Sequence, residues 1–426
     1  MTFAVFLFSL VGSIGIGVPI AFALILCGVA LMVHLDMFDA QIIAQNLTNG
    51  ADSFPLMAVP FFLLAGEIMN VGGLSRRIVN VAMSLVGHFK GGLGYVAILA
   101  GCLLAALSGS AVADAAALGA LMVPMMVRAG HDKKRAAGLV AAAGCIGPVI
   151  PPSIGFIIFG VAGGLSITKL FLAGIVPGLL IGAALCVAWW IVVRKEPAAT
   201  APKQTGVQRI NAVLAGLWAL LLPVIIVLGL KMGVFTPTEA AVVAVVYSLF
   251  VAVVVYKELK LSDLFDVFLA TAKTSAVVMF LIAAALVAAW LITVADLPGV
   301  VVDLLEPLMD NQLLLLAAIM LFVIAVGTAM DMTPSILILT PVLLPVVKAA
   351  GIDPIYFGVL FIINCSIGLI TPPVGSVLNV VAGVSKLSLE DVVKGVLPFI
   401  LAELAVLVLL VLFPPLVTVP AQWFAR

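Results

Sequence analysis

The chain has 426 residues, of which 65% are hydrophobic and only 9% are charged, and its formal net charge is zero. Soluble domains carry roughly 25% charged residues, so the composition excludes an ordinary soluble protein. The balanced charge gives no indication of nucleic-acid binding. Apolar runs of about 20 residues, the length of a membrane-spanning helix, recur along the whole chain. The sequence therefore predicts an all-α polytopic membrane protein that is embedded in a lipid bilayer.

The apolar segments, taken in chain order, begin with residues 1–33, which we interpret as one long or two short spans with a kink at Gly15, Gly17 and Pro19. Further spans are predicted at 168–193, 211–230, 239–256, 273–295 and 396–418. The polar stretch 194–209 is typical of a linker between two halves. Basic residues concentrate in the segments 74–92, 127–138, 193–209 and 256–265, which the positive-inside rule places in the cytoplasm.

Residues 123–153 and 344–375 share one pattern of Gly, Pro and Asp positions. Pro124 and Pro345 differ in number by 221 (345 − 124 = 221). The same difference separates Gly130 from Gly351, Asp132 from Asp353, Gly147 from Gly368, Pro151 from Pro372 and Pro177 from Pro398. The loop of the first copy carries Arg128, Lys133, Lys134 and Arg135, whereas the second carries only Lys348. The positive-inside rule puts the two loops on opposite sides of the membrane, which predicts an inverted repeat.

Each copy contains a proline-rich break in an apolar helix, "GPVIPPSIG" at 147–155 and "GLITPPVGS" at 368–376. Proline removes a backbone donor and clashes with the preceding turn, which leaves carbonyl oxygens without partners. Such oxygens survive in a membrane only within protein or around a polar cavity, and they suit a hard cation such as Na⁺. A plain proline kink is the alternative interpretation. The predicted carbonyl donors are Gly147, Ile150 and Pro152 in the first copy and Gly368, Thr371 and Pro373 in the second, where Thr371 also offers its hydroxyl.

A re-entrant hairpin is predicted before each break, over 100–124 and 313–345. Its arms have roughly 10–15 apolar residues, short of the ~20 that a full crossing needs, and its tips lie at 108–114 and 327–335. Carboxylates inside a membrane are costly and are therefore candidates for functional residues. Asp114 and Asp331, at the two tips, are such candidates. Capping of the following helix is the preferred role for Asp114, and both roles stay open for Asp331. Packing or subunit contact is the interpretation for Glu67, Glu239 and Glu403.

Neither tip nor break contains Lys or Arg, so an anionic substrate would depend on helix N-termini, hydroxyls and bound Na⁺. The nearest hydroxyls in the first half are Ser108, Ser110 and Ser153, and Ser153 begins the resumed helix, where an anion is favoured. The sequence contains no HExxH or Walker A motif and no nucleophile–base pair, so we expect an ion-driven transporter rather than an enzyme. A proton-coupled stand-alone organic-anion carrier using Asp331, or a channel, remains the alternative.

The motifs "SGSAVADAAALGALMVP", "GPVIPPSIGFIIFG", "GVFTPTEAAVVA" and "LITPPVG" resemble the DctM-type large membrane subunit of tripartite ATP-independent periplasmic (TRAP) transporters. The resemblance covers essentially the whole chain and is greatest for a subgroup associated with sugar-acid uptake, including diketogulonate. It implies an elevator fold of the ion transporter superfamily, in which a transport domain carries Na⁺ and an organic acid across the bacterial inner membrane. Sugar acids, sialic acid and C4-dicarboxylates are the implied substrate classes.

The same resemblance implies two partners, a soluble periplasmic substrate-binding protein and a small four-helix membrane subunit of the DctQ type, expected as a separate chain. It assigns one Na⁺ site to Ser108, Gly147, Ile150 and Pro152, and a second to Gly327, Gly368, Thr371 and Pro373. It assigns substrate contact to Ser108 or Ser110, Ser153 and Asp331. The implied division is N-terminal scaffold and arm helices at 1–92, a first transport repeat at 93–167, scaffold helices at 168–295, a second transport repeat at 296–387 and a C-terminal scaffold helix at 388–426.

Overall fold

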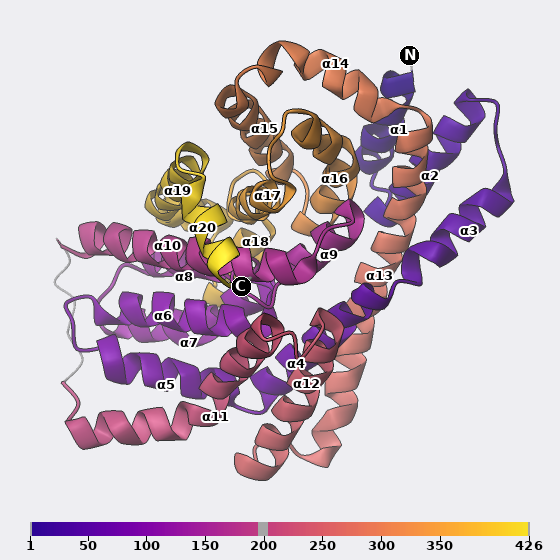
Figure 1. The fold of residues 1–426 in the computed structure, drawn as a ribbon. Helices are drawn as coiled ribbons and strands as arrows, with labels where there is room; N and C mark the ends of the chain where they lie inside the picture. The colour runs from indigo at the N-terminus through magenta and orange to yellow at the C-terminus, as the bar shows by residue number, and fades with distance from the viewer. Residues whose placement is uncertain (1, 195–202, 425–426) are drawn as a thin grey trace.

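A computed structural model describes residues 2–194 and 203–424, and helices with short connections make up these ranges (Figure 1). Residues 195–202 of the expected linker lie outside the described residues. The first half contains α1 (Thr2–Gly15), α2 (Ile20–His34), α3 (Ala40–Ala51), η1 (Phe54–Met57), α4 (Ala58–Val71), α5 (Leu74–Val86), α6 (Gly92–Ser108), α7 (Ala111–Arg128), α8 (Lys133–Gly144), α9 (Ile154–Gly163) and α10 (Ile167–Val193). The second half contains α11 (Gly206–Lys231), α12 (Pro237–Phe250), η2 (Val251–Val255), η3 (Leu261–Asp263), α13 (Leu264–Val294), α14 (Leu297–Met309), α15 (Gln312–Gly327), α16 (Met332–Ala349), α17 (Pro354–Gly368), α18 (Ser376–Ser385), α19 (Leu389–Leu412) and α20 (Pro415–Phe424).

Within the described ranges, eight helical segments have the length and hydropathy needed to cross a membrane. Four of them, α10, α11, α12 with η2, and α13, contain the predicted spans 168–193, 211–230, 239–256 and 273–295, except that the last two predicted spans end one residue beyond their helices. The predicted span 396–418 is wrong in its bounds, because α19 already begins at Leu389 and ends at Leu412 before Pro414 and Pro415. The N-terminal segment forms two short helices that pack against each other, with Gly17 in a left-handed turn (φ 87°) between them. The chain is a multi-pass α-helical membrane protein.

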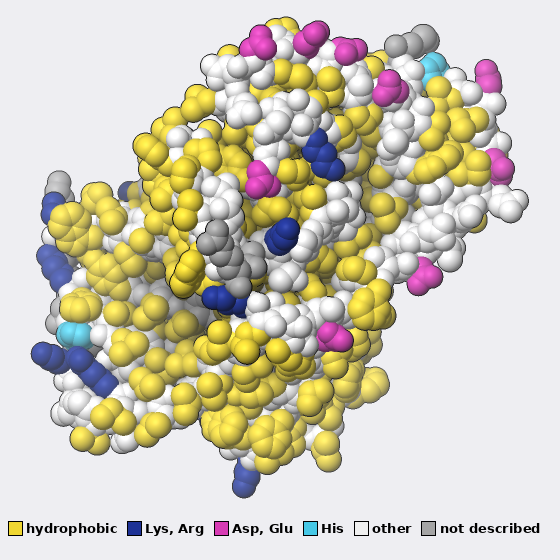
Figure 2. Space-filling model, in the orientation of Figure 1, with side chains coloured by type: hydrophobic (Ala, Val, Ile, Leu, Met, Phe, Trp, Pro, Cys, Tyr) yellow, Lys and Arg dark blue, Asp and Glu magenta, His cyan; other side chains and the backbone are white. Residues whose placement is uncertain are grey.

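In Figure 2 most acidic side chains and a cluster of basic side chains lie towards different edges of the visible face, and further Lys and Arg side chains lie near its centre and at the bottom. Apolar side chains cover most of the visible face, and many large ones are exposed, as lipid contact requires. Acidic side chains lie along the top and right of this view, over α14 and the α2–α3 region. Lys and Arg side chains, with a histidine, gather at the left edge, where α5 and α10 end and α11 begins.

The two hairpins have longer arms than we expected. The arms α6 and α7 have 17 and 18 residues, and α15 and α16 have 16 and 18, so the predicted length of 10–15 residues is wrong. Their tips, Gly109–Ser110 and Thr328–Asp331, fall inside the predicted tip segments. The bounds of α7 and α16 differ by 221 at both ends (332 − 111 and 349 − 128).

The broken helices cross over between the two hairpins. The helix after the first break, α9, packs against α16, and the helix after the second break, α18, packs against α7. The long helices α10 and α19 pack against each other and against α8 and α17. A separate group of contacts joins α4 with α12 and α13, and α13 with α2 and α3. The two groups touch where α4 and α5 pack on α6 and where α13 and α14 pack on α16.

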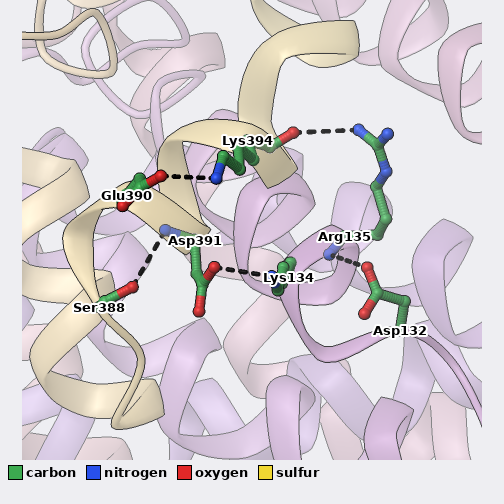
Figure 3. Close-up of polar contacts among 7 residues, drawn as sticks. All are labelled: Asp132, Lys134, Arg135, Ser388, Glu390, Asp391 and Lys394. Atoms are coloured by element: carbon green, nitrogen blue, oxygen red, sulfur yellow. Dashed lines mark hydrogen bonds and ion pairs between the residues drawn. The ribbon is translucent and has the colours of Figure 1, made fainter.

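Figure 3 shows how α19 is held beside α8. Lys134 forms an ion pair with Asp391 at 2.7 Å, and the Arg135 guanidinium donates to the Lys394 carbonyl at 3.2 Å. The two backbones touch here, because a Cβ on Gly395 would lie 1.9 Å from the Lys134 carbonyl oxygen. The start of α19 therefore lies beside the start of α8.

Candidate ion and substrate site

The first helix break lies between Gly144, where α8 ends, and Ile154, where α9 begins. Gly147, Ile150 and Pro152 are buried, and no hydrogen bond to their carbonyl oxygens is found among the described residues. Buried carbonyl groups are paired in the great majority of native structures. These three unpaired oxygens are therefore suited to binding a ligand. A simple proline kink would not need three buried carbonyl oxygens without partners.

The tip of the first hairpin lies directly against this break. A Cβ on Gly109 would lie 2.5 Å from the Pro152 carbonyl oxygen, and Gly109 has φ 62°. A Cβ on Gly147 would lie 2.6 Å from Asp114 Oδ2. Both glycines are needed for the close approach of tip and break, because any side chain would push the two apart.

Asp114 has an unpaired carboxylate oxygen at this contact. The Ser108 hydroxyl donates to Asp114 Oδ1 at 2.6 Å, whereas Oδ2 is buried and has no hydrogen-bond partner. The predicted capping role of Asp114 is wrong, because Ser110 is the N-cap of α7 and accepts from the Ala113 N–H. Asp114 was not among the expected ion ligands, although a carboxylate at a hairpin tip inside a membrane was a signal for a functional role.

The predicted substrate serines differ in their surroundings. Ser108 and Ser110 border a cavity of about 30 Å³ together with Glu67 and Asn70 of α4. Glu67 was interpreted as a packing or subunit-contact residue, and its position beside two serines was not visible in the sequence. A cavity of this size has room for only a few water molecules, so an organic acid needs this space to open.

Ser153 is fully buried at the start of α9. Its hydroxyl donates to the Pro148 carbonyl and accepts from the Phe156 N–H at 3.2 Å. Ser153 thus holds the break together as an N-cap, and it does not border the cavity formed by Ser108 and Ser110.

The second break, between Gly368 and Ser376, repeats the first with differences. A Cβ on Gly368 would lie 2.8 Å from the Cα of Gly327, so hairpin tip and break again meet through backbone. The Gly368 carbonyl was expected to be unpaired, but it accepts from the Thr371 N–H at 3.1 Å. The Thr371 hydroxyl donates to the Ile367 carbonyl at 2.7 Å.

The second break is also more open than the first. Residues 372–374 are exposed, whereas all residues from 144 to 160 are buried. The carbonyls of Thr371 and Pro373 have no hydrogen-bond donor among the described residues. The second set of predicted oxygens is therefore only partly free, and it is reached from the surface.

Asp331 precedes α16 at the tip of the second hairpin and is exposed. Its side chain makes no capping hydrogen bond, so the capping alternative is wrong. Instead, Asp331 Oδ1 accepts from the Ser376 hydroxyl at 3.0 Å, which connects the tip to the start of α18.

The helices that precede the two breaks, α8 and α17, meet at their C-terminal ends. The Ser366 hydroxyl donates to the Cys145 carbonyl at 2.6 Å, and these residues are 221 positions apart. The carbonyl ends of α8 and α17 meet near this contact, and α7, α9, α16 and α18 begin at the tips and breaks. Helix C-termini favour cations and N-termini favour anions, so the cluster suits a cation together with a carboxylate. No group of three or more His, Cys, Asp or Glu side chains that could hold a metal ion occurs in the described ranges.

Two hairpin tips that meet two helix breaks inside a multi-pass bundle are the features of a membrane transporter with discontinuous helices. The chain belongs to the family of large permease subunits of TRAP transporters. The family described as "Tripartite ATP-independent periplasmic transporter, DctM component" matches residues 7–416.

Curated relatives cover nearly the whole chain. The 2,3-diketo-L-gulonate TRAP transporter large permease protein YiaN of Escherichia coli is 58% identical, over 99% of this chain and 100% of its own length. The sialic acid TRAP transporter large permease protein SiaM of Vibrio cholerae is 40% identical over 96% of each chain. The C4-dicarboxylate TRAP transporter large permease protein DctM of Pseudomonas aeruginosa is 38% identical over 89% of each. The YdaH transporter of Alcanivorax borkumensis shares the fold, with a TM-score of 0.64 at 17% identity over 88% of this chain and 89% of its own.

Proposed function

We propose that this chain imports a small organic acid across the bacterial inner membrane, driven by Na⁺. The observation that carries the proposal is the buried, unpaired Oδ2 of Asp114, which faces the first helix break. In that break the carbonyl oxygens of Gly147, Ile150 and Pro152 have no hydrogen-bond donor among the described residues. A carboxylate oxygen and several carbonyls are the ligands that hard cations prefer. The relatives named for diketogulonate, sialic acid and C4-dicarboxylate support an organic acid, and the 58% identity to the first favours a sugar acid.

Two Na⁺ ions are proposed as co-transported substrates. The first would be held by Ser108, Gly147, Ile150 and Pro152, to which we add Asp114. The second would be held by Gly327, Gly368, Thr371 and Pro373. Contact between the Gly327 and Gly368 backbones supports the second grouping, although the Gly368 carbonyl has to accept an additional ligand there.

The organic acid is proposed to bind where the hairpin tips meet the breaks, next to Ser108, Ser110 and Asp331. Ser153, which is buried and caps α9, would contact the acid only after this region opens. The helices α7 and α16 begin at these tips, and their N-termini would attract the carboxylate of the organic acid. The cavity beside Ser108 lies against α4, so the substrate would enter between α4 and the first hairpin. Glu67 in that cavity would repel an anion, which makes neutralisation by Na⁺ a requirement for binding.

Inversion of the two copies is supported by their contacts with α19. Lys134, at the start of α8, pairs with Asp391, whereas the Tyr356 hydroxyl, at the start of α17, donates to the Leu410 carbonyl at 2.9 Å. These two contacts are 19 residues apart on α19 (410 − 391 = 19), or about 28 Å at ~1.5 Å per residue. The equivalent helices α8 and α17 therefore start at opposite ends of α19. An inverted repeat across a hydrocarbon core of about 30 Å requires this arrangement.

An elevator movement is proposed for the group formed by the hairpins and broken helices, against a scaffold that includes α4, α12 and α13. The packing of α10 and α19 on α8 and α17 favours placing these two helices with the moving group, although we expected 168–295 and 388–426 to be scaffold. The transport repeats would keep their expected ranges, 93–167 and 296–387.

Two partners complete the proposal, a small four-helix membrane subunit and a soluble periplasmic protein that delivers the acid. The test is uptake of labelled sugar acids and dicarboxylates into proteoliposomes that contain this chain and its small subunit, with and without an inward Na⁺ gradient and the binding protein. We expect uptake to require both. Uptake independent of Na⁺ would overturn the ion sites, and uptake independent of the binding protein would indicate a stand-alone carrier or a channel.

A further inference from the structure

A groove of about 640 Å³ lies on the outer surface of the bundle, away from the hairpin tips and breaks. Its walls are the end of α5, the first half of α6 and the second half of α10. The lining is almost entirely apolar and includes Val86, Ile98, Leu99, Leu179 and Ala183. This surface is too apolar for water and needs an occupant in the membrane.

The mouth of the groove carries two positive charges. Lys90 lines it, and its Nζ donates to the Arg194 carbonyl at 2.9 Å. The Arg194 guanidinium lies over the ring of Trp190, 3.3 Å from its centroid, and Trp190 also lines the groove. No carboxylate pairs with Lys90 or Arg194 among the described residues. Figure 2 shows the basic side chains gathered at this edge, where α5 and α10 end.

The depth of the groove matches one leaflet of a bilayer. Trp190 at the mouth and Leu179 at the inner end are 11 residues apart on α10 (190 − 179 = 11), a rise of about 16 Å. Half of a hydrocarbon core of ~30 Å is about 15 Å. Trp190 and Tyr95 are both lining residues, and Trp and Tyr favour the membrane–water interface.

A neighbouring groove shows that the charge is particular to this one. Between α10 and α19 lies a second apolar groove of about 590 Å³, and none of its lining residues is charged. Both grooves can hold acyl chains, but only the first has cations placed to meet a negative headgroup. Basic pockets between helices on the cytoplasmic side attract anionic lipid headgroups.

We propose that the groove between α5, α6 and α10 binds one anionic phospholipid of the cytoplasmic leaflet. Its acyl chain lies along α6 and α10, and its phosphate lies against Lys90 and Arg194. A lipid bound there contacts α5, α6 and α10 together, and α6 is one arm of the first hairpin.

The first test measures binding of phosphatidylglycerol and phosphatidylcholine to the full-length chain by native mass spectrometry and by lipid titration in detergent. We expect tighter binding of phosphatidylglycerol. Lys90→Gln and Arg194→Gln should each weaken its binding about five-fold, which corresponds to about 1 kcal/mol per charge. The control Lys260→Gln removes an exposed charge outside the groove and should leave the affinity unchanged.

The second test blocks the apolar part of the groove. Ala183→Phe should reduce phosphatidylglycerol binding, whereas Ala184→Phe, one residue further on and lining the uncharged groove, should not. Equal binding of the two lipids by the unaltered chain, or unchanged phosphatidylglycerol binding in all three groove variants, would overturn the proposal. Loss of the co-purifying small membrane subunit in Ala183→Phe, with lipid binding unchanged, would identify the groove as a subunit interface instead.

Discussion

Replacing Gly368 by alanine tests whether the contact between the second hairpin tip and the second break shapes an ion site. The new Cβ would lie 2.8 Å from the Gly327 Cα, whereas ordinary contacts begin at 3.4 Å, so the backbones must separate by 0.6 Å (3.4 − 2.8). Metal–ligand distances tolerate only about 0.2 Å. Overpacking of this kind costs about 1–3 kcal/mol. We therefore expect the Na⁺ concentration for half-maximal uptake to rise about five-fold or more, since ~1 kcal/mol corresponds to about five-fold.

The assay is uptake of labelled organic acid into proteoliposomes over a series of external Na⁺ concentrations, together with a thermal melt of the purified protein. Gly383→Ala is the matched control, because a Cβ at Gly383 in α18 meets nothing within 4 Å. Alanine in a helix interior is more favourable than glycine by about 0.5–1 kcal/mol, so this variant should melt slightly higher with the same Na⁺ dependence. An unaltered Na⁺ dependence in well-folded Gly368→Ala would refute the reasoning.

Three further predictions follow from single contacts. Asp114→Asn removes the negative charge that faces the first break. Because interactions with a charged group are worth about 1.5–3 kcal/mol, the Na⁺ concentration for half-maximal uptake should rise ten-fold or more. An unchanged concentration would contradict the role of Asp114. Trp189→Phe removes the indole N–H that donates to the Gly91 carbonyl at 2.8 Å. The melting temperature should fall by an amount equivalent to about 1–3 kcal/mol of stability. An unaltered melting temperature would show that water replaces the lost hydrogen bond. Lys134→Met breaks the ion pair between Lys134 and Asp391, whose side chains are 45% and 31% exposed. Solvent screens such a pair, so the melting temperature should hardly change. A clear drop would mean that solvent screens the pair less than its exposure indicates.

The features that the sequence determined by itself are local in origin. Membrane class follows from apolar length, and the helices end at Gly144 and Gly368 because prolines follow at fixed positions. The hairpin tips fall where small and polar residues interrupt apolar arms. Arm length was underestimated, because small and polar residues near the tips continue the helices instead of forming loops.

Only the tertiary structure decided which atoms face one another. Ser110 rather than Asp114 caps α7, because the Asp114 carboxylate is turned towards the first break, a segment more than 30 positions away in the chain. Glu67 reaches the hairpin serines because α4 packs on α6. The second break differs from the first because it is exposed and already internally hydrogen-bonded. Such pairings depend on how distant helices pack, and residue spacing along the chain determines only the local conformation of each segment.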